Sequence, residues 1–511
     1  MKIVTNNLKK HLTNRLIIVF LLIFLQLLFL LYVLFNLKDS LFINICLNVF
    51  SYVILIYVIN RQDNPSYKIA WCVLILLFPL FGGILYLLFG GRKISKNLKM
   101  ANLSYDAVSK NLDYSKDKLQ ELYSLDKAAY KIFNYGNNCD GFAVCEDTQV
   151  TFFKNGNEKF KSLLVELEKA KHFIFLEYFI IEEGKMWNAI LEILERKAKE
   201  HVDVRIIYDD FGCATNLPSD YDKLLMKKGI KAYKFNRLRP ALIIQMNNRD
   251  HRKIVVIDNN VGYCGGVNLA DEYINEKVRF GVWKDNAVML KGKAVETLTL
   301  MFLQMYNFLA GVNEYDFSQY LIPCEKVTSD GFVQAYCDSP TDSDDVGLNM
   351  HLNLINNAKK YIYIYTPYLI ITSELSKALC LASQNGVDVR ICVPHIPDKS
   401  YVFAITRSNY KALIEKGVKI YEFTPGFVHA KSFVSDDEYA ICGTVNTDYR
   451  SYYLHFECGV LMYKSKAIVE MKKDFLETLK VSEEVSIDDC NNVYLLTRIY
   501  RAILNLFAPL F

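Results

Sequence analysis

Apolar residues are distributed unevenly along this chain of 511 residues, with long runs near the N-terminus and short periodic stretches after about residue 135. Residues 16–35 are almost entirely Leu, Ile, Phe and Val. A helix of that length, rising about 1.5 Å per residue, would span about 30 Å, which is the thickness of a bilayer core. Two further apolar runs cover residues 41–59 and 69–89, the second interrupted by Pro79 and a pair of glycines. The pattern predicts transmembrane helices ahead of a large folded region.

Basic residues around these runs constrain how the chain would sit in a membrane. Four precede the first run and four follow the third, namely Lys2, Lys9, Lys10, Arg15, Arg92, Lys93, Lys96 and Lys99. The positive-inside rule places both clusters in the cytoplasm, which requires an even number of crossings. We therefore expect that one of the three runs does not cross, and the interrupted third run is the best candidate. Three true crossings would instead place the folded region outside the cell.

Cysteine usage favours the cytoplasmic arrangement. The thirteen cysteines are an odd number and include no Cys-x-x-Cys pair. Such a pattern is typical of unpaired thiols in a reducing compartment. The prediction is a multi-pass protein of the cell membrane with its folded region on the cytoplasmic face.

The chain after about residue 135 contains one pattern twice, at an offset of roughly 170 to 190 residues. Three stretches of the first copy recur in the second: residues 170–175 as 358–363, 202–205 as 387–390, and 228–233 as 416–421. In each copy an apolar strand precedes a helix-like stretch, and a second strand precedes a helix that ends at Lys-Gly. Alternating strands and helices are typical of layered α/β domains. We expect two homologous α/β units that pack face to face about a pseudo-twofold axis.

The expected domain organisation follows from these patterns. Residues 1–95 would form the membrane region with two or three apolar segments, 96–135 a helical connector, 136–325 the first unit and 326–511 the second. The second unit ends in a stretch whose apolar residues recur at helical spacing, namely Leu495, Ile499, Ile503 and Leu506. Two interpretations of this amphipathic helix remain open. It docks on the protein's own core, or it lies on a lipid surface.

The main chemical signal is a duplicated His-x-Lys-x-x-x-x-Asp pattern. The two copies comprise His251, Lys253 and Asp258, then His429, Lys431 and Asp436, and an asparagine follows each copy, Asn268 and Asn446. A lone His-x-Lys is usually accidental, but two full copies with the same downstream asparagine form a specific signal. Each motif begins a predicted strand, where residues two apart face the same side. The pseudo-twofold packing would bring both motifs to one cleft.

This set of side chains fits cleavage of a phosphodiester. One neutral histidine can attack phosphorus while a second, protonated histidine donates a proton to the leaving oxygen. The two lysines would neutralise the nonbridging oxygens, and Asn268 and Asn446 would donate hydrogen bonds to them. Asp258 and Asp436 lie on the opposite strand face, so we assign them to holding the fold of the motif.

Each histidine also needs a carboxylate that fixes its tautomer. The repeat aligns Asp285 with Glu457, and each is followed by an apolar run. We expect Asp285 to orient His251 and Glu457 to orient His429. No third His or Cys stands at ligand spacing near either motif, so zinc binding by His251 and His429 is not expected.

These residues resemble the motifs of the phospholipase D superfamily, and further stretches resemble bacterial cardiolipin synthases within it. The matching stretches are residues 64–71, 176–178, 208–212, 248–253, 265–273, 366–368 and 443–451. The chain departs from the family pattern at Asn286-Ala287, where Thr-His is frequent, and at His455, where Asn is common. The resemblance implies two phospholipase D-like α/β/α units packed as a pseudo-dimer behind N-terminal transmembrane helices.

The resemblance also implies a reaction. A phosphatidyl group would pass from one phosphatidylglycerol of the membrane to another through a phosphatidyl-histidine, giving cardiolipin and glycerol. His251 would be the nucleophile, and His429 would protonate the leaving glycerol and then deprotonate the incoming hydroxyl. This scheme requires no nucleotide and no metal.

Other functions share part of the same pattern. A membrane-anchored phospholipase D that hydrolyses lipids, or a transphosphatidylase with another alcohol acceptor, would use the same catalytic residues. A nuclease of the superfamily is disfavoured because the net charge is only +4 and the apolar runs are long, so no nucleic-acid partner is expected. A non-enzymatic scaffold is disfavoured because both motifs are complete.

Overall fold

The computed structural model describes residues 24, 25, 28, 31, 32, 41–78, 82–90, 115–238, 247–312, 316–328, 331–341 and 344–510. Most of the first apolar run, and both basic clusters beside the apolar runs, lie outside these residues. Within the described part of the chain, no helix combines the length and the apolar character that a bilayer crossing needs. The transmembrane segments therefore stay a prediction.

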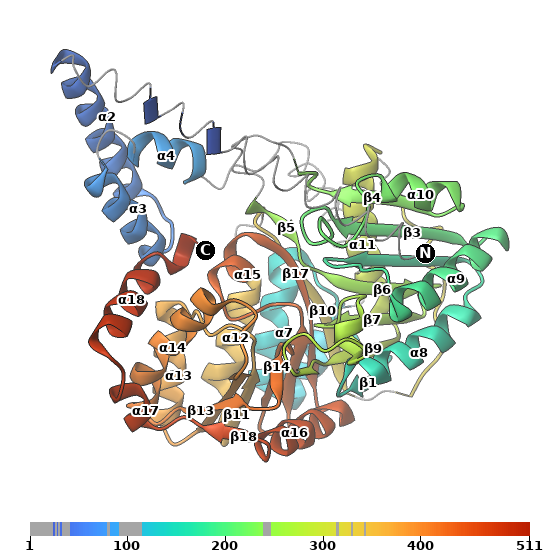
Figure 1. Cartoon of the computed structure of the whole chain (residues 1–511). Helices are drawn as coiled ribbons and strands as arrows, with labels where there is room; N and C mark the ends of the chain where they lie inside the picture. Colours follow the sequence, from blue (N-terminus) through green and yellow to red (C-terminus); the bar gives the residue numbers. More distant parts are fainter. Residues whose placement is uncertain are drawn as a thin grey trace.

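The second and third apolar runs form three helices at one end of the molecule (Figure 1). These are α2 (Leu41–Asn60), α3 (Pro65–Leu77) and α4 (Gly82–Phe89). The glycine pair allows α4 to approach its neighbours closely. A Cβ atom on Gly82 would lie 2.3 Å from the Cα of Ile75, and one on Gly83 would lie 2.9 Å from the hydroxyl oxygen of Ser51. Glycine thus lets α4 pack directly on α3 and α2.

The first α/β unit contains a seven-stranded sheet. Across the sheet its strands are β1 (Thr148–Phe153), β9 (Ala287–Gly292), β7 (Val261–Gly265), β6 (Lys253–Ile257), β2 (Phe173–Tyr178), β3 (Asp203–Asp209) and β4 (Lys231–Phe235). Its helices are α8 (Gly156–Lys169), α9 (Lys185–Lys199), α10 (Tyr221–Lys227), η2 (Asp271–Ile274) and α11 (Val295–Ala310). Strands β2, β3 and β4 are parallel, whereas β6 runs antiparallel to β2.

The second unit repeats this strand order. Its strands are β10 (Phe332–Asp338), β17 (His455–Tyr463), β16 (Tyr439–Gly443), β15 (Ser432–Ser435), β11 (Tyr361–Tyr365), β12 (Asp388–Pro394), β13 (Lys419–Phe423) and an added edge strand, β18 (Ser482–Glu484). Its helices are α12 (Val346–Asn357), α13 (Ser373–Gln384), α14 (Ser400–Ile414), α15 (Tyr449–Tyr453), α16 (Lys466–Leu479), α17 (Ile487–Asn491), α18 (Leu495–Leu506) and η3 (Ala508–Leu510). The prediction of two homologous α/β units is confirmed.

The two sheets share one apolar core. Strands β7 and β9 of the first unit contact β16 and β17 of the second, and the Sγ atoms of Cys264 and Cys458 lie 3.6 Å apart at this junction. Helix α11 covers the same side of the first sheet, where Phe302 stacks on Phe175 with ring centroids 4.6 Å apart. A second core cluster fills the space between the first sheet and helices α8 and α9.

Two short strands pass between the units and position the site. β5 (Arg249–Asp250) precedes the first motif and pairs in parallel with the start of β17. β14 (Gly426–Val428) precedes the second motif and pairs in parallel with β8 (Val282–Lys284) of the first unit. Each motif histidine therefore follows a strand that is hydrogen-bonded to the other unit.

The two ends of the folded region pack on the second unit. The described part of the predicted connector forms α6 (Ser115–Leu125) and α7 (Lys127–Asp140), and α7 packs against α12 and β10. At the other end, α18 packs on α14 and also contacts α3 (Figure 1). The helix thus contacts its neighbours, but not through the predicted apolar face, because Leu495, Ile499 and Ile503 of that face are exposed. Tyr494, Leu496 and Tyr500 are exposed beside them.

Candidate active site

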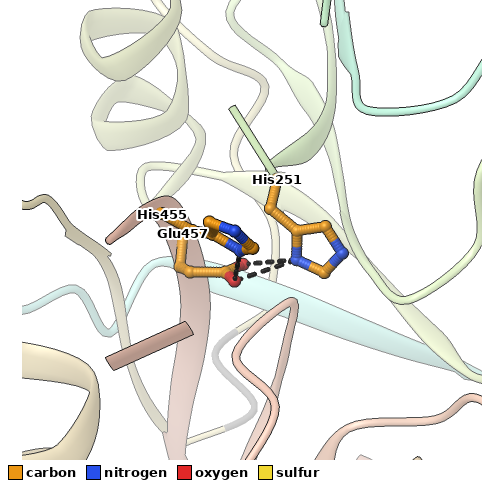
Figure 2. Close-up of side chains that lie close together, drawn as sticks. All are labelled: His251, His455 and Glu457. Atoms are coloured by element: carbon orange, nitrogen blue, oxygen red, sulfur yellow. Dashed lines mark hydrogen bonds and ion pairs between the residues drawn. The ribbon is translucent and has the colours of Figure 1, made fainter. Parts of the chain in front are cut away.

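The imidazole of His251 is held by a carboxylate from the other unit. Its Nδ1 atom lies 2.9 Å from each carboxylate oxygen of Glu457, a residue of β17 (Figure 2). The backbone explains this contact, because the backbone N–H of His251 donates to the carbonyl of Phe456 at 2.9 Å. Thr444 also donates its hydroxyl to Glu457, at 2.5 Å. With Nδ1 as the donor, Nε2 keeps a free lone pair.

The imidazole of His429 makes the reciprocal contact. Its Nδ1 atom lies 2.7 Å from an oxygen of Asp285, in the first unit. Here the backbone N–H of His429 donates to the carbonyl of Lys284 at 2.7 Å. The expectation that Asp285 orients His251 and that Glu457 orients His429 is therefore wrong. The carboxylates were the correct residues, but each serves the other unit's histidine because β5 and β14 cross between the units.

Burial sets the protonation state of both imidazoles. Removal from water lowers the pKa of His251 to about 3, although the charge of Glu457 acts in the opposite direction. Burial, together with the charge of Lys431, lowers the pKa of His429 to about 4. Burial alone would raise the pKa values of Glu457 and Asp285, but the adjoining histidines hold them below their usual range. At neutral pH the unliganded site thus holds neutral imidazoles beside ionised carboxylates.

The two motif lysines are buried beside the histidines. The ammonium groups of Lys253 and Lys431 donate to the backbone carbonyls of His251 and His429, respectively. Burial lowers the pKa of Lys253 to about 8 and that of Lys431 to about 7. Lys253 also contributes to the lowered pKa of His429, so the charges of one motif act on the other. The structure thereby brings the two motifs into one electrostatic unit.

The two asparagines have different surroundings. Asn268 is engaged on both sides, since its amide oxygen accepts from the Ile180 N–H at 3.0 Å and its amide nitrogen donates to the Tyr273 hydroxyl at 2.7 Å. The amide oxygen of Asn446 is buried and has no hydrogen-bond partner among the described residues. The amide of Asn268 is thus fixed by protein groups, whereas Asn446 keeps unused hydrogen-bonding capacity.

Asp258 and Asp436 bind backbone rather than the cleft. Each carboxylate accepts three backbone N–H groups at the start of a neighbouring strand: Asp258 from residues 171–173 and Asp436 from residues 359–361, at 2.7–2.9 Å. Each aspartate also begins a tight turn with a positive φ, 51° and 58° respectively, which Asp tolerates better than most residues. These contacts tie the motif strand to the adjacent strand β2 or β11.

Aromatic side chains complete the walls around the histidines. The ring of Phe179 stands edge-on to His251 with centroids 5.1 Å apart, and Tyr273 does the same to His429 at 5.3 Å. Trp283 lies 5.4 Å from His429, and His455 lies 5.5 Å from His251, between ring centroids. None of these four neighbours belongs to the duplicated motif. Trp283 and His455 stand at aligned positions of the repeat, each two residues before the carboxylates Asp285 and Glu457.

Buried Lys159 on α8 is a further basic residue that lies outside the duplicated motif. Its ammonium donates to the Tyr178 hydroxyl and the Val267 carbonyl, both at 3.0 Å. Burial lowers its pKa to about 7, against the charge of Asp285. This lysine adds to the positive potential around the site.

A duplicated α/β fold that unites two His-x-Lys motifs defines the phospholipase D class of phosphoryl-transfer enzymes. The family model described as "Cardiolipin synthase, PLD-like domain" matches residues 163–305 and 351–479. A second model, "Phospholipase_D-nuclease N-terminal", matches residues 47–91. The chain belongs to the cardiolipin synthase family, and it is a phosphatidyltransferase of the phospholipase D type.

Individual relatives cover nearly the whole chain. A cardiolipin synthase of Halalkalibacterium halodurans is 33% identical over 465 residues, which span 89% of this chain and 91% of that protein. Cardiolipin synthase 2 of Bacillus cereus is 34% identical and spans 89% of this chain and 88% of its own. An uncharacterized protein of Streptococcus mutans serotype c is 44% identical, over 89% of this chain and 99% of its own.

A solved structure shares the fold. The phosphatidylserine synthase of Haemophilus influenzae aligns with a TM-score of 0.55 at 16% identity, covering 75% of this chain and 98% of its own. At this identity the likeness concerns the fold alone.

Proposed function

We propose that this protein makes cardiolipin by transferring a phosphatidyl group from one phosphatidylglycerol to another. The observation that carries the proposal is the pair of buried imidazoles, each held by a carboxylate of the opposite unit. Such a pair supplies one nucleophile and one proton donor without moving the backbone.

In the first step the free lone pair of His251 Nε2 attacks phosphorus. The P–O bond to glycerol breaks, and His429 gives that oxygen a proton, so glycerol leaves and a phosphatidyl-histidine remains. Burial keeps His251 neutral, which suits a nucleophile. His429 is also neutral in the unliganded site, so it must take up a proton from solvent when the donor lipid binds. The negative charge of the bound phosphodiester raises the pKa of a neighbouring imidazole and favours this protonated form.

In the second step the terminal hydroxyl of another phosphatidylglycerol attacks the phosphatidyl-histidine. His429 takes the hydroxyl proton, the new P–O bond forms, and His251 leaves as a neutral imidazole. Lys253 and Lys431 offset the charge of the nonbridging oxygens. Asn446 donates a hydrogen bond to one of these oxygens, and Asn268 holds the adjacent loop through Ile180 and Tyr273.

A mainly apolar cavity beside the site supports a lipid substrate. Its volume is about 310 Å³, and it lies between α3, α4, α15 and η3. Its lining includes Asn64, Tyr67, Trp71, Leu74, Leu85, Asn248, Tyr449, Tyr453, Leu454 and Leu510. Leu454 lies three residues before Glu457, and Asn248 lies three residues before His251, so the cavity adjoins the segments that carry these two residues. An acyl chain placed there would exclude water, which competes with the acceptor hydroxyl.

The same end of the molecule offers a surface for the membrane. The exposed apolar face of α18 lies next to α3, and α2 exposes many apolar side chains, among them Phe42, Ile45 and Val49. We place this end against the cytoplasmic leaflet of the cell membrane, with the N-terminal segments as its anchor. The cleft then opens toward the lipid that it uses.

The test is to incubate the purified protein in detergent–lipid micelles with phosphatidylglycerol alone and to follow the products by mass spectrometry. Cardiolipin and glycerol should accumulate in equal amounts, and the His251→Ala variant should form neither. Phosphatidic acid without cardiolipin would replace the proposal with a hydrolytic phospholipase D. Activity that appears only after adding another alcohol would replace it with a different transphosphatidylase.

A further inference from the structure

His455 lies beside the His251–Glu457 pair and has no role in the reaction proposed above (Figure 2). Its side chain is only 10% exposed. Neither of its ring nitrogens has a hydrogen-bond partner in the described parts of the chain. Its Nδ1 atom lies 3.6 Å from Oε1 of Glu457, within ion-pair distance. A buried imidazole without a hydrogen bond, facing a carboxylate, is a costly arrangement that calls for a ligand.

The three side chains have the composition and spacing of a transition-metal site. Two histidines and one glutamate are a frequent zinc ligand set, and tetrahedral zinc with bonds of about 2.0–2.2 Å places its ligand atoms about 3.4 Å apart. Here Nδ1 of His251 lies 2.9 Å from Glu457, and Nδ1 of His455 lies 3.6 Å from it. One ligand atom from each of the three lies within 4.8 Å of the others. Small side-chain shifts would close this set around a cation.

Among the residues that the structure describes, the second motif has no equivalent set. Trp283 occupies the position aligned with His455, and its indole lies against His429 with centroids 5.4 Å apart. An indole N–H only donates hydrogen bonds and does not bind cations as a ligand. At aligned positions of the repeat, His251 thus has a second imidazole beside it and His429 has an indole.

We propose that His251, His455 and Glu457 bind a divalent transition cation of the zinc class, and that its binding inhibits the enzyme. The cation takes the Nδ1 lone pair of His251 in place of the hydrogen bond to Glu457. The imidazole stays neutral because its proton moves to Nε2. That atom then has no lone pair with which to attack phosphorus. The inhibitory part rests on the proposed function, whereas the binding part does not.

Binding is tested on the full chain in detergent after treatment with a chelator. Equilibrium dialysis against Zn²⁺ should give one tightly bound ion per chain, with affinity at least about tenfold weaker in His455→Asn and in Glu457→Gln. The matched control is His395→Asn. The Nδ1 atom of His395 also lies 2.9 Å from a glutamate, Glu422, but its side chain is 41% exposed, and among the described residues it belongs to no cluster of three metal-ligating side chains. Equal zinc affinity in wild type and His455→Asn would overturn the proposal.

A second measurement needs no variant. X-ray absorption of the zinc-loaded wild-type protein should give only nitrogen and oxygen neighbours at about 2.0–2.2 Å, with the scattering of two imidazoles. A sulfur shell at about 2.3 Å would assign the ion to some of the thirteen cysteines and would overturn the site.

Inhibition is measured as the zinc concentration that halves each variant's own metal-free turnover. This concentration should rise at least about tenfold in His455→Asn and stay unchanged in His395→Asn. Zinc that binds at the three residues but leaves turnover unchanged would overturn the inhibitory part alone. A wild-type protein that makes no cardiolipin yet binds zinc at this set would reject the proposed function and retain the metal site.

Discussion

The two units share a strand order and a motif, but they surround their histidines differently. In the first site, His251 faces both oxygens of Glu457 and has a second imidazole, His455, nearby. Its neighbouring lysine, Lys253, contacts the backbone carbonyl of the histidine. This environment leaves Nδ1 with the carboxylate alone and Nε2 with its lone pair free.

In the second site, His429 shares its Nδ1 between two charged groups. Asp285 lies 2.7 Å from it and the ammonium of Lys431 lies 3.0 Å from it, while Trp283 covers the ring. A lysine charge adds to burial in lowering the pKa of both imidazoles, Lys431 for His429 and Lys253 for His251, so the two sites differ in their contacts. Duplicated parts have thus been placed in unequal surroundings, which gives a physical basis for dividing the roles of nucleophile and proton donor.

The sharpest test of this division replaces each histidine in turn. A phosphatidyl substrate with a nitrophenolate leaving group needs no proton donor. We expect His429→Ala to release one nitrophenolate per chain and to retain the phosphatidyl group on His251, visible by mass spectrometry. His251→Ala should lose turnover by about 10⁴-fold or more, because the nucleophile is absent. An adduct on His429 would reverse the assignment.

Replacing the carboxylate that contacts the opposite unit's histidine should have a smaller but equally specific effect. Glu457→Gln should slow the release of nitrophenolate by about 10²–10⁴-fold, because the amide favours the wrong tautomer of His251. Asp285→Asn should leave this release nearly unchanged and slow only turnover of phosphatidylglycerol, where His429 must carry a proton. Stopped-flow absorbance measures the release of nitrophenolate, and product analysis measures the turnover of phosphatidylglycerol. The opposite pattern would support pairing within each unit.

Replacing the motif aspartates should affect stability more than turnover. Asp258→Asn and Asp436→Asn place an amide nitrogen opposite a backbone N–H that now donates to the carboxylate, while asparagine still tolerates the positive φ. Each should lower the free energy of unfolding by about 1–3 kcal/mol, measured by denaturant titration. Turnover per folded molecule should change little in both. A large, unequal loss of turnover would indicate a catalytic role for one of them.

Acid sensitivity provides the smallest expected difference between the units. The second unit buries His351, whereas the aligned position of the first unit, 188 residues earlier, is Leu163. Burial lowers the pKa of His351 to about 3, and an unfolded histidine titrates near 6.5. Between these values only the unfolded chain takes up this proton, so stability falls as the pH falls through 6.5.

The melting temperature should therefore decrease between pH 7.5 and pH 5, and His351→Gln should reduce that decrease by about 2–4 °C. His251 and His429 also have lowered pKa values, so part of the decrease should remain. The control is His172→Gln, at an exposed position, which should retain the wild-type decrease. A variant of His351 with the full wild-type decrease would show that this histidine does not couple folding to protons.

Much of this protein was determined locally by its sequence. The alternation of apolar strands and amphipathic helices, repeated once, predicted two α/β units because each period depends on only a few neighbouring residues. The strand predicted from the motif is also local, although the structure begins β6 at Lys253 and leaves His251 in the link between β5 and β6. Both carboxylates, Glu457 and Asp285, were identified by their aligned positions.

Only the tertiary structure decided which carboxylate meets which histidine. That pairing depends on β5 and β14, which hydrogen-bond to strands of the opposite unit. Neither of these strand pairings leaves a local pattern in the sequence. The approach of His455 to His251 has the same origin, since 204 positions separate them in the chain. Sequence periodicity records which face of an element is buried. Contacts between distant elements are set by how the two units pack, and that packing is a property of the whole fold.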